Sequence, residues 1–361
     1  MDEGSLTAFV KRVSGSDHQR VEEDFGEGFV RLRISEAERR QALQDIRGSE
    51  DIVLELLRNA RDAHASHIFL ATSREGARRT ILCIDDGEGI PASMHRRVFE
   101  PRVTSKLDSS HLDTWGLHGR GMALYSISQA ASDARVVASS PGQGTALWVE
   151  TSIDQVGERR NQSTFPTFVR GEGNGVAVRG PRNILRTCCE FALAERARCT
   201  VHVGSATEVA AALFHHACGS LSSFDRAFGP DPASLPVAKR LGLAADPASF
   251  ARIAATLGLS FSERSARRIL DGAVAPAPGI LDLVSIEAPP TRSNAPRHRR
   301  PDACSVSLSA EDRAQLAEGV RAAYAPLAQR FYLEPDVEPL VRVSGDRLLI
   351  SVPLASQREG R

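Results

Sequence analysis

Two short segments contain polar residues spaced for nucleotide and metal chemistry. In the first, Glu55, Asn59 and Asp62 are separated by four and then three residues, which places the three side chains on one face of a helix. In the second, Asp85 ends an apolar run and precedes two closely spaced glycines. A helix face with carboxylate and amide groups, opposite a glycine-flanked aspartate, is suited to a nucleotide and its metal ion.

Regular elements must hold these residues in place, and the apolar pattern predicts where they lie. The apolar residues of the first segment fall on the helix side opposite the polar ones, and they are Ile52, Val53, Leu56, Leu57 and Ala60. The pattern predicts helices over 36–47, 51–64, 92–98 and 119–131. It predicts strands over 66–73, 79–85, 134–139 and 145–151.

The composition sets limits on the class of protein. The chain has 361 residues, is 42% apolar and 25% charged, and has a formal net charge of zero. This is typical of globular domains, and no global field draws the chain to nucleic acid or to a membrane. The six cysteines form no C-x-x-C pair, which disfavours a zinc site or a disulfide framework. Without an apolar signal core or a membrane-spanning run, we expect a cytoplasmic protein.

Outside residues 29–152 the sequence predicts smaller parts. These are a polar N-terminal arm (1–28), an α/β second domain (153–224), a helical region (236–271), a proline- and arginine-rich linker (275–301) and a C-terminal α/β segment (302–361).

Residues 250–270 have a helix-turn-helix rhythm, and the second helix would carry Arg264, Arg267 and Arg268. DNA binding is one interpretation of this pattern. Packing within the protein, or contact with a protein partner, is the other.

The order of motifs from 55 to 149 resembles the GHKL ATPase superfamily. This group includes gyrase-type topoisomerases, the ninety-kilodalton heat-shock chaperones, histidine kinases and MutL mismatch-repair ATPases. The resemblance covers 29–152 and rests on separated motifs in the same order. It implies an α+β fold, a two-layer α/β sandwich with a mixed sheet, that binds ATP and Mg²⁺.

The first segment carries the catalytic part of the resemblance. By that match, the side-chain oxygen of Asn59 binds Mg²⁺, for which a neutral amide oxygen is a suitable hard ligand. Asp62 belongs to the same motif. Glu55 occupies the position of the residue that polarises the attacking water, and histidine kinases usually lack it. The resemblance is therefore nearest to the MutL-like hydrolysing branch.

The second segment carries the adenine part of the resemblance. By that match, Asp85 accepts a hydrogen bond from the adenine amino group and so selects adenine over guanine. Gly87 and Gly89 let the backbone approach the base, and Ile90 follows them. The family often has asparagine where this chain has Asp86, which is a mild departure.

Residues 100–118 form a long polar loop, and long loops in compact domains are usually functional or disordered. By the resemblance this loop is a lid over the nucleotide. Thr104 and Ser105 would donate hydrogen bonds to phosphate oxygens, and Lys106 would offset their charge.

A glycine-rich stretch follows the lid and begins a helix. Backbone amides at a helix start bind phosphate, and Gly119 and Gly121 allow them a close approach. Arg120 either adds positive charge or points to solvent. Further along, Thr145 would support the adenine through water and Asp85.

Three functions fit this sequence. The leading one is slow hydrolysis of ATP as a conformational switch that controls an effector region or protein partner, with closure creating a homodimer contact. A non-hydrolysing ATP sensor that contacts DNA or protein is the second. A histidine-kinase-like phosphotransferase is the third. It would need an upstream phospho-accepting histidine on a helix, whereas His18 lies in sequence without helical period.

Overall fold

The computed structural model describes residues 21–105, 111–113, 116–118, 121–170, 176–222, 224–225, 229–284, 286–287, 310–331, 333–344 and 347–353. The chain divides into two compact units, Met1–Pro289 and Pro290–Arg361.

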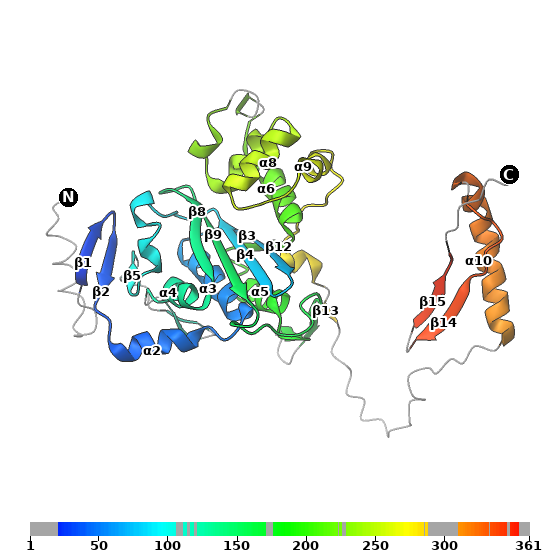
Figure 1. The fold of residues 1–361 in the computed structure, drawn as a ribbon, viewed down its shortest axis with the longest axis horizontal. Helices are drawn as coiled ribbons and strands as arrows, with labels where there is room; N and C mark the ends of the chain where they lie inside the picture. Colours follow the sequence, from blue (N-terminus) through cyan, green and yellow to red (C-terminus); the bar gives the residue numbers. More distant parts are fainter. Residues whose placement is uncertain are drawn as a thin grey trace, which may run out of the picture. The chain divides into compact units, whose positions relative to one another are not determined.

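A five-stranded sheet forms the centre of the first unit (Figure 1). Its order is β12 (Thr200–Gly204), β3 (His67–Glu75), β4 (Arg78–Asp85), β9 (Thr145–Ser152) and β8 (Asp133–Ser139). The pair β12–β3 is parallel, and the other pairs are antiparallel. The predicted α+β class with a mixed sheet is therefore confirmed.

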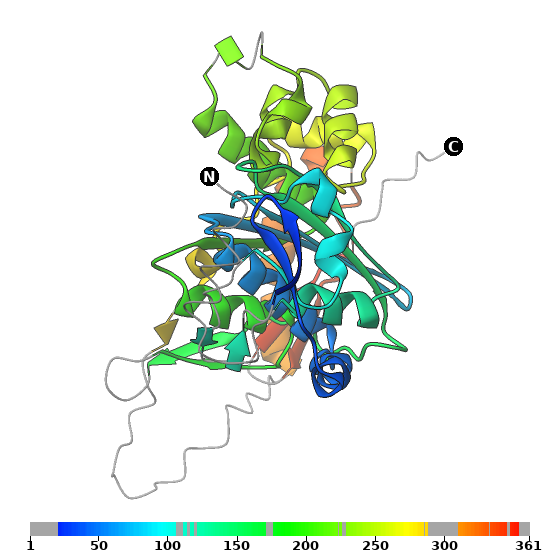
Figure 2. The ribbon, with the colours of Figure 1, turned by 90° about the vertical axis from the view of Figure 1, so that its left-hand side faces the viewer.

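Helices cover both faces of this sheet (Figure 2). One layer contains α3 (Ser49–Asp62), α4 (Ala123–Ala130) and α5 (Ile184–Ala194). The other contains α6 (Ala206–Ser220), η6 (Val237–Leu243), α8 (Pro247–Thr256) and α9 (Glu263–Leu270). Neighbouring strand residues enter opposite cores: Ile68 packs with the α3 layer, and Phe69 packs with the α6 layer. Burial on both faces explains why β3 and β4 are apolar at consecutive positions.

The sequence predicts a domain boundary between residues 152 and 153, but the central sheet continues beyond that point. Strand β12 lies beyond that boundary but pairs with β3 along its whole length. Helices α5 and α6 pack on the same sheet through Phe191 and Leu213. Pairing between strands more than a hundred residues apart has no local sequence signal, so the pattern alone did not place β12 in the sheet.

A second small sheet contains β1 (Val21–Gly26), β2 (Phe29–Leu32) and β5 (Val103–Thr104), in the order β1-β2-β5. The polar arm predicted over 1–28 thus includes a strand, which pairs with β2. The start of the predicted lid also includes a strand, because β5 pairs with the other edge of β2. Helix α2 (Glu36–Asp45) follows β2 in the chain, and a capping box forms between Ser35 and Glu38.

Shorter elements complete the first unit. They are η2 (Ala92–Met94), η3 (Arg97–Phe99), β6 (His111–Asp113), β7 (Gly116–His118), β10 (Thr167–Arg170), β11 (Val176–Arg179), η5 (Pro232–Ser234), η7 (Ile280–Leu283) and β13 (Ile286–Glu287). Strand β13 pairs with β10, and Ile280 is buried. The predicted linker at 275–301 therefore begins inside the folded unit, and residues 285 and 288–301 of it lie outside the described residues.

The predicted helix-turn-helix rhythm corresponds to α8 and α9. Ala266 and Ile269 of α9 are buried in the core shared with α6 and the sheet. Arg264, Arg267 and Arg268 are exposed. The apolar side of the helix is thus used for packing within the unit, and the arginine side remains accessible.

The second unit contains α10 (Ala310–Phe331) and a hairpin of β14 (Leu340–Ser344) and β15 (Arg347–Ser351). Tyr324, Ala328 and Val337 form its small core. Within the described parts of both units, no helix combines the length and the apolar character needed to cross a bilayer.

The substitution Ile52→Val tests how much the core beneath α3 contributes to the stability of the fold. Ile52 is fully buried there. We expect the free energy of unfolding to fall by about 1 kcal/mol, because a methyl group is lost and a cavity forms. Urea denaturation followed by circular dichroism measures this. The matched change Ile153→Val, at a half-buried position outside the core clusters, should have a smaller effect; equal effects would contradict the assignment.

Candidate active site

A cavity of about 650 Å³ lies between α3, the ends of β4 and β9, α4 and β5. The predicted site residues that line it are Glu55, Asn59, Asp62, Asp85, Gly89, Ile90, Thr104, Ser105, Gly121 and Thr145. Gly87 lies beside the cavity, in the turn that holds Asp85. Lys106, Gly119 and Arg120 lie outside the described residues. The fold thus brings to one cavity residues as far apart in sequence as Glu55 and Thr145.

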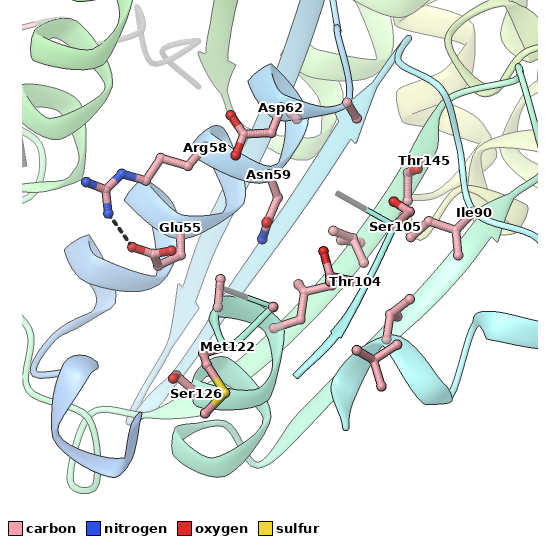
Figure 3. A pocket seen from close by; sticks show the side chains of 18 of the residues that line it. Glu55, Arg58, Asn59, Asp62, Ile90, Thr104, Ser105, Met122, Ser126 and Thr145 are labelled. Atoms are coloured by element: carbon pink, nitrogen blue, oxygen red, sulfur yellow. Dashed lines mark hydrogen bonds and ion pairs between the residues drawn. The ribbon is translucent and has the colours of Figure 1, made fainter. Parts of the chain in front are cut away.

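The polar face of α3 forms one wall of this cavity (Figure 3). Arg58 Nη1 donates a hydrogen bond of 2.6 Å to Glu55 Oε1, and the Arg58 side chain is only 6% exposed. Asp62 Oδ1 accepts a bond of 2.9 Å from Arg61 Nε, and Arg61 also donates to Glu195, the C-cap residue of α5. The two carboxylates of this face are therefore held in place by arginines of the same helix.

Asn59 lies between these carboxylates, and its side chain points into the cavity (Figure 3). Its Nδ2 atom is buried and has no hydrogen-bond partner among the described residues. Leaving a buried polar group unsatisfied costs about 1–3 kcal/mol, and such groups in native proteins need an explanation. A bound ligand would supply one here, since the amide can turn either its oxygen or its nitrogen toward the cavity.

The opposite wall is the turn after β4. Asp85 is buried, and its Oδ1 accepts a hydrogen bond of 2.9 Å from Gly87 N. A Cβ atom on Gly87 would lie 2.5 Å from Ala63 O. Gly89 has φ of +75°, and a Cβ there would lie 1.9 Å from Ser140 O. Both glycines are thus required by close backbone packing, which fixes the direction of Asp85.

Asp86 has a different role from Asp85. Its Oδ1 accepts hydrogen bonds of 2.8 Å from Ser66 N and His67 N. It therefore ties the turn to the start of β3. An asparagine oxygen could accept the same bonds, so the departure from the family at this position leaves the turn intact.

Ser139 is a supporting residue that the sequence analysis missed. Its hydroxyl accepts a bond of 2.7 Å from Ile90 N and donates one of 2.8 Å to Gly144 O. The Thr145 hydroxyl lies 3.1 Å from Ser139 Oγ. Because the Ser139 hydroxyl already donates its one hydrogen to Gly144 O, Thr145 is the donor in this contact. Ser139 thus links the two residues that would flank the base. The only sequence signal was a serine at the end of a predicted strand.

The base of the predicted lid is anchored on two sides. Arg102 N donates to Gly121 O over 2.9 Å, and Leu32 N donates to Arg102 O over 3.0 Å. The Arg102 side chain forms an ion pair with Glu38 of α2. Thr104 and Ser105 follow directly and line the cavity. This part of the predicted lid therefore starts from a fixed position.

Several further residues of the cavity wall were not found from the sequence. Acidic side chains dominate it: Glu38, Asp45, Asp51 and Glu88 join Glu55, Asp62 and Asp85. Burial, and then the nearby charge of Glu55, raise the pKa of Asp45. Arg58 is the only arginine or lysine of the wall among the described residues. Ser126 of α4 also lines the cavity, and its hydroxyl is buried without a partner in the described chain.

An acidic wall needs cations if it is to hold phosphates. Within the described ranges no group of three or more histidine, cysteine and acidic side chains is arranged to hold a metal. Mg²⁺ at nucleotide sites takes one or two protein ligands, with substrate phosphates and water supplying the rest. The Asn59 amide oxygen is a suitable ligand for such an ion, its unpartnered Nδ2 could donate to a ligand oxygen, and the glycine-lined turn fits a nucleotide.

Comparison with known proteins supports this interpretation. Residues 44–155 match the family described as histidine kinase-, DNA gyrase B- and HSP90-like ATPase. The chain is also similar to the DNA mismatch repair protein MutL of Staphylococcus aureus, in strains Newman, JH1 and Mu3, at 34% identity over 123 residues. The match covers 33% of this chain and only 18% of each relative. The resemblance predicted from the motifs is thereby confirmed for this domain.

Proposed function

We propose that the chain binds ATP with Mg²⁺ and hydrolyses it slowly as a conformational switch, because residues 44–155 match the histidine kinase-, DNA gyrase B- and HSP90-like ATPase family. The observation that carries the proposal is one cavity with Asn59 on the helix wall and Asp85 on the opposite wall. The effector is a region outside this domain or a protein partner.

In this proposal the adenine lies against the turn after β4. Asp85 accepts the hydrogen bond of its amino group, Thr145 supports it through water, and Gly89 and Ile90 contact the ring. The phosphates extend toward Asn59, Thr104 and Ser105, with Lys106, Gly119, Arg120 and Gly121 assigned to them by the family match. Asn59 would hold Mg²⁺, which when bound offsets phosphate charge.

Hydrolysis would then depend on Glu55. Its carboxylate accepts a proton as water attacks the γ-phosphorus, and the bond to the bridging oxygen breaks to give ADP and phosphate. A positioned base contributes about 10²–10⁴-fold in rate. Asp62, held by Arg61, supports the same helix face beside Asn59.

The proposal is tested by two measurements on the purified full chain. Equilibrium titration with ATP, with and without Mg²⁺, measures binding, and phosphate release measures turnover. Binding that requires Mg²⁺ and slow release of phosphate are expected. Absence of ATP binding would overturn the whole proposal, and binding without turnover would favour the sensor described below.

Asn59→Ala tests the metal ligand separately. We expect ATP affinity in Mg²⁺ to fall about tenfold, which corresponds to about 1.4 kcal/mol for one lost ligand bond, with little change in EDTA. Isothermal titration calorimetry in both buffers measures the difference. Gln44→Ala removes an exposed amide from α2 and should change neither value. An equal loss with and without Mg²⁺ would contradict the role of Asn59 in holding the ion.

A non-hydrolysing sensor that contacts DNA is the second candidate, favoured by the exposed arginines of α9. Arg264, Arg267 and Arg268 are all accessible on one short helix. DNA affinity that falls with salt, with a smaller slope in Arg267→Ala/Arg268→Ala, would support it. No DNA binding at low salt would leave these arginines as a solvated surface.

We also propose that nucleotide binding closes the predicted lid and creates a contact with a second copy of the chain. Sedimentation velocity with a non-hydrolysable ATP analogue and Mg²⁺ tests this step. A dimer that appears only with the analogue is expected. A monomer under both conditions would exclude the homodimer and direct attention to a different protein partner.

A further inference from the structure

The contact between Arg58 and Glu55 has a consequence for the proposed reaction. We propose that Arg58 is a positioning residue that fixes the Glu55 carboxylate for proton transfer and sets the pH range in which it can act. This inference rests on the proposed ATP hydrolysis. The family match at this helix involves Glu55, Asn59 and Asp62, and it assigns nothing to Arg58.

Burial of Arg58 is the first observation behind this inference. Its side chain is 6% exposed and that of Glu55 is 18% exposed. A guanidinium loses hydration at such a position, so its partner must compensate for the cost. Removing either member takes away a charged partner that lies 2.6 Å from the other. The pair is therefore a fixed part of the site and not a mobile surface ion pair.

The geometry is the second observation. Arg58 Nη1 and Glu55 Oε1 are 2.6 Å apart, and the residues are one helical turn apart on α3. Figure 3 shows Arg58 approaching the carboxylate from the side away from Asn59. This contact limits the rotation of the Glu55 side chain. A base whose direction is fixed before substrate arrives contributes more to catalysis than one that must be ordered during the reaction.

The charges around the pair make Arg58 electrostatically important. Asp45 and Glu38 of α2 line the same cavity, as do Asp51 and Asp62 of α3. Burial and the Glu55 charge raise the pKa of Asp45, which indicates that Asp45 and Glu55 affect each other. Helix α4 and strand β5 add only uncharged groups to the described wall. Arg61 pairs with Asp62 and Arg102 pairs with Glu38, and Arg58 is the described cation of the cavity wall that contacts Glu55.

The sign of the expected pH effect follows from this arrangement. An adjacent positive charge favours the ionised form of a carboxylate. Without that charge, a carboxylate among other carboxylates takes up a proton at higher pH. Because the base must be ionised to accept a proton, the activity would then be lost at a higher pH than in the wild type.

The test compares kcat, KM and the pH profile of kcat in Arg58→Gln, Arg58→Lys and the wild type. In Arg58→Gln we expect the acid limb of the profile to move up by about one pH unit, and kcat at neutral pH to fall about tenfold or more. KM should remain within about threefold. In Arg58→Lys the acid limb should stay in place, but kcat should still fall several-fold, because an ammonium lacks the planar guanidinium geometry.

The control variant is Arg40→Gln, which removes an exposed arginine of α2 from its ion pair with Glu36. Its profile should match the wild type. An unmoved acid limb in Arg58→Gln would overturn the inference. If Arg58→Gln does not fold, the inference would instead be overturned by a kcat in Arg58→Lys equal to that of the wild type. A wild-type protein without turnover would refute the proposed function, which is a different and separable result.

Discussion

Replacement of Glu55 by glutamine should reduce the rate of ATP hydrolysis by about 10²–10⁴-fold, the range that a positioned general base contributes. ATP affinity should stay within about threefold of the wild type. Glutamine has nearly the same shape and keeps an oxygen that can accept the 2.6 Å hydrogen bond from Arg58. The substitution therefore removes the proton acceptor with little change in the cavity wall.

Single-turnover phosphate release and nucleotide titration on the same protein preparations measure the two quantities. The matched control is Glu36→Gln, on the exposed side of α2, which should behave as the wild type. Unchanged turnover in Glu55→Gln would remove Glu55 from the mechanism. Loss of binding together with turnover would indicate that Glu55 acts on the ground state, for example through the shape of the cavity.

Much of the nucleotide domain could be predicted because its signals are local. The helix carrying Glu55 and Asn59 was expected at 51–64 and spans Ser49–Asp62. The strand ending at Asp85 was expected at 79–85 and spans Arg78–Asp85. In each case the apolar period, the turn residues and the family motif agree. Consistency between these levels makes a short segment predictable.

The parts that could not be predicted depend on contacts between distant segments. Strand β5 has two residues and exists because β2 pairs with it across about seventy positions. Ser139 supports Ile90 from the far end of β8. Asp45 enters the cavity from α2, beside Glu55. Ser139 and Asp45 belong to no motif, so only the fold identifies them.

The acidic wall changes how the site must be understood. Motifs alone suggested a nucleotide pocket with phosphate donors at 104–106 and 119–121. The described wall has Thr104, Ser105 and Gly121 of these and adds seven carboxylates and one arginine, and two of the carboxylates pair with Arg61 and Arg102. A triphosphate would be repelled from such a wall unless cations accompany it. Nucleotide binding by this domain should therefore be more dependent on the divalent ion than the motifs alone imply.

Asp85→Asn should weaken ATP binding by about 10²-fold and reduce the preference for ATP over GTP. A hydrogen bond to a charged group contributes about 1.5–3 kcal/mol, and 1.4 kcal/mol is a factor of ten in affinity. The asparagine oxygen can keep the bond from Gly87 N. Its NH₂ group would then face the adenine amino group, so that two donors meet, whereas guanine presents an acceptor at that position.

Competition titrations with ATP and GTP in Mg²⁺ measure both effects. Asp86→Asn is the matched control, since it makes the same chemical change at the next residue. Among the described residues, Asp86 accepts bonds from Ser66 N and His67 N, which an amide oxygen can also accept. The affinities of Asp86→Asn for ATP and GTP should therefore remain at the wild-type values. Equal losses in the two variants would mean that the turn, and not the Asp85 carboxylate, determines recognition. Loss of ATP binding in Asp85→Asn alone, with GTP binding retained or gained, would locate adenine selection in this one side chain.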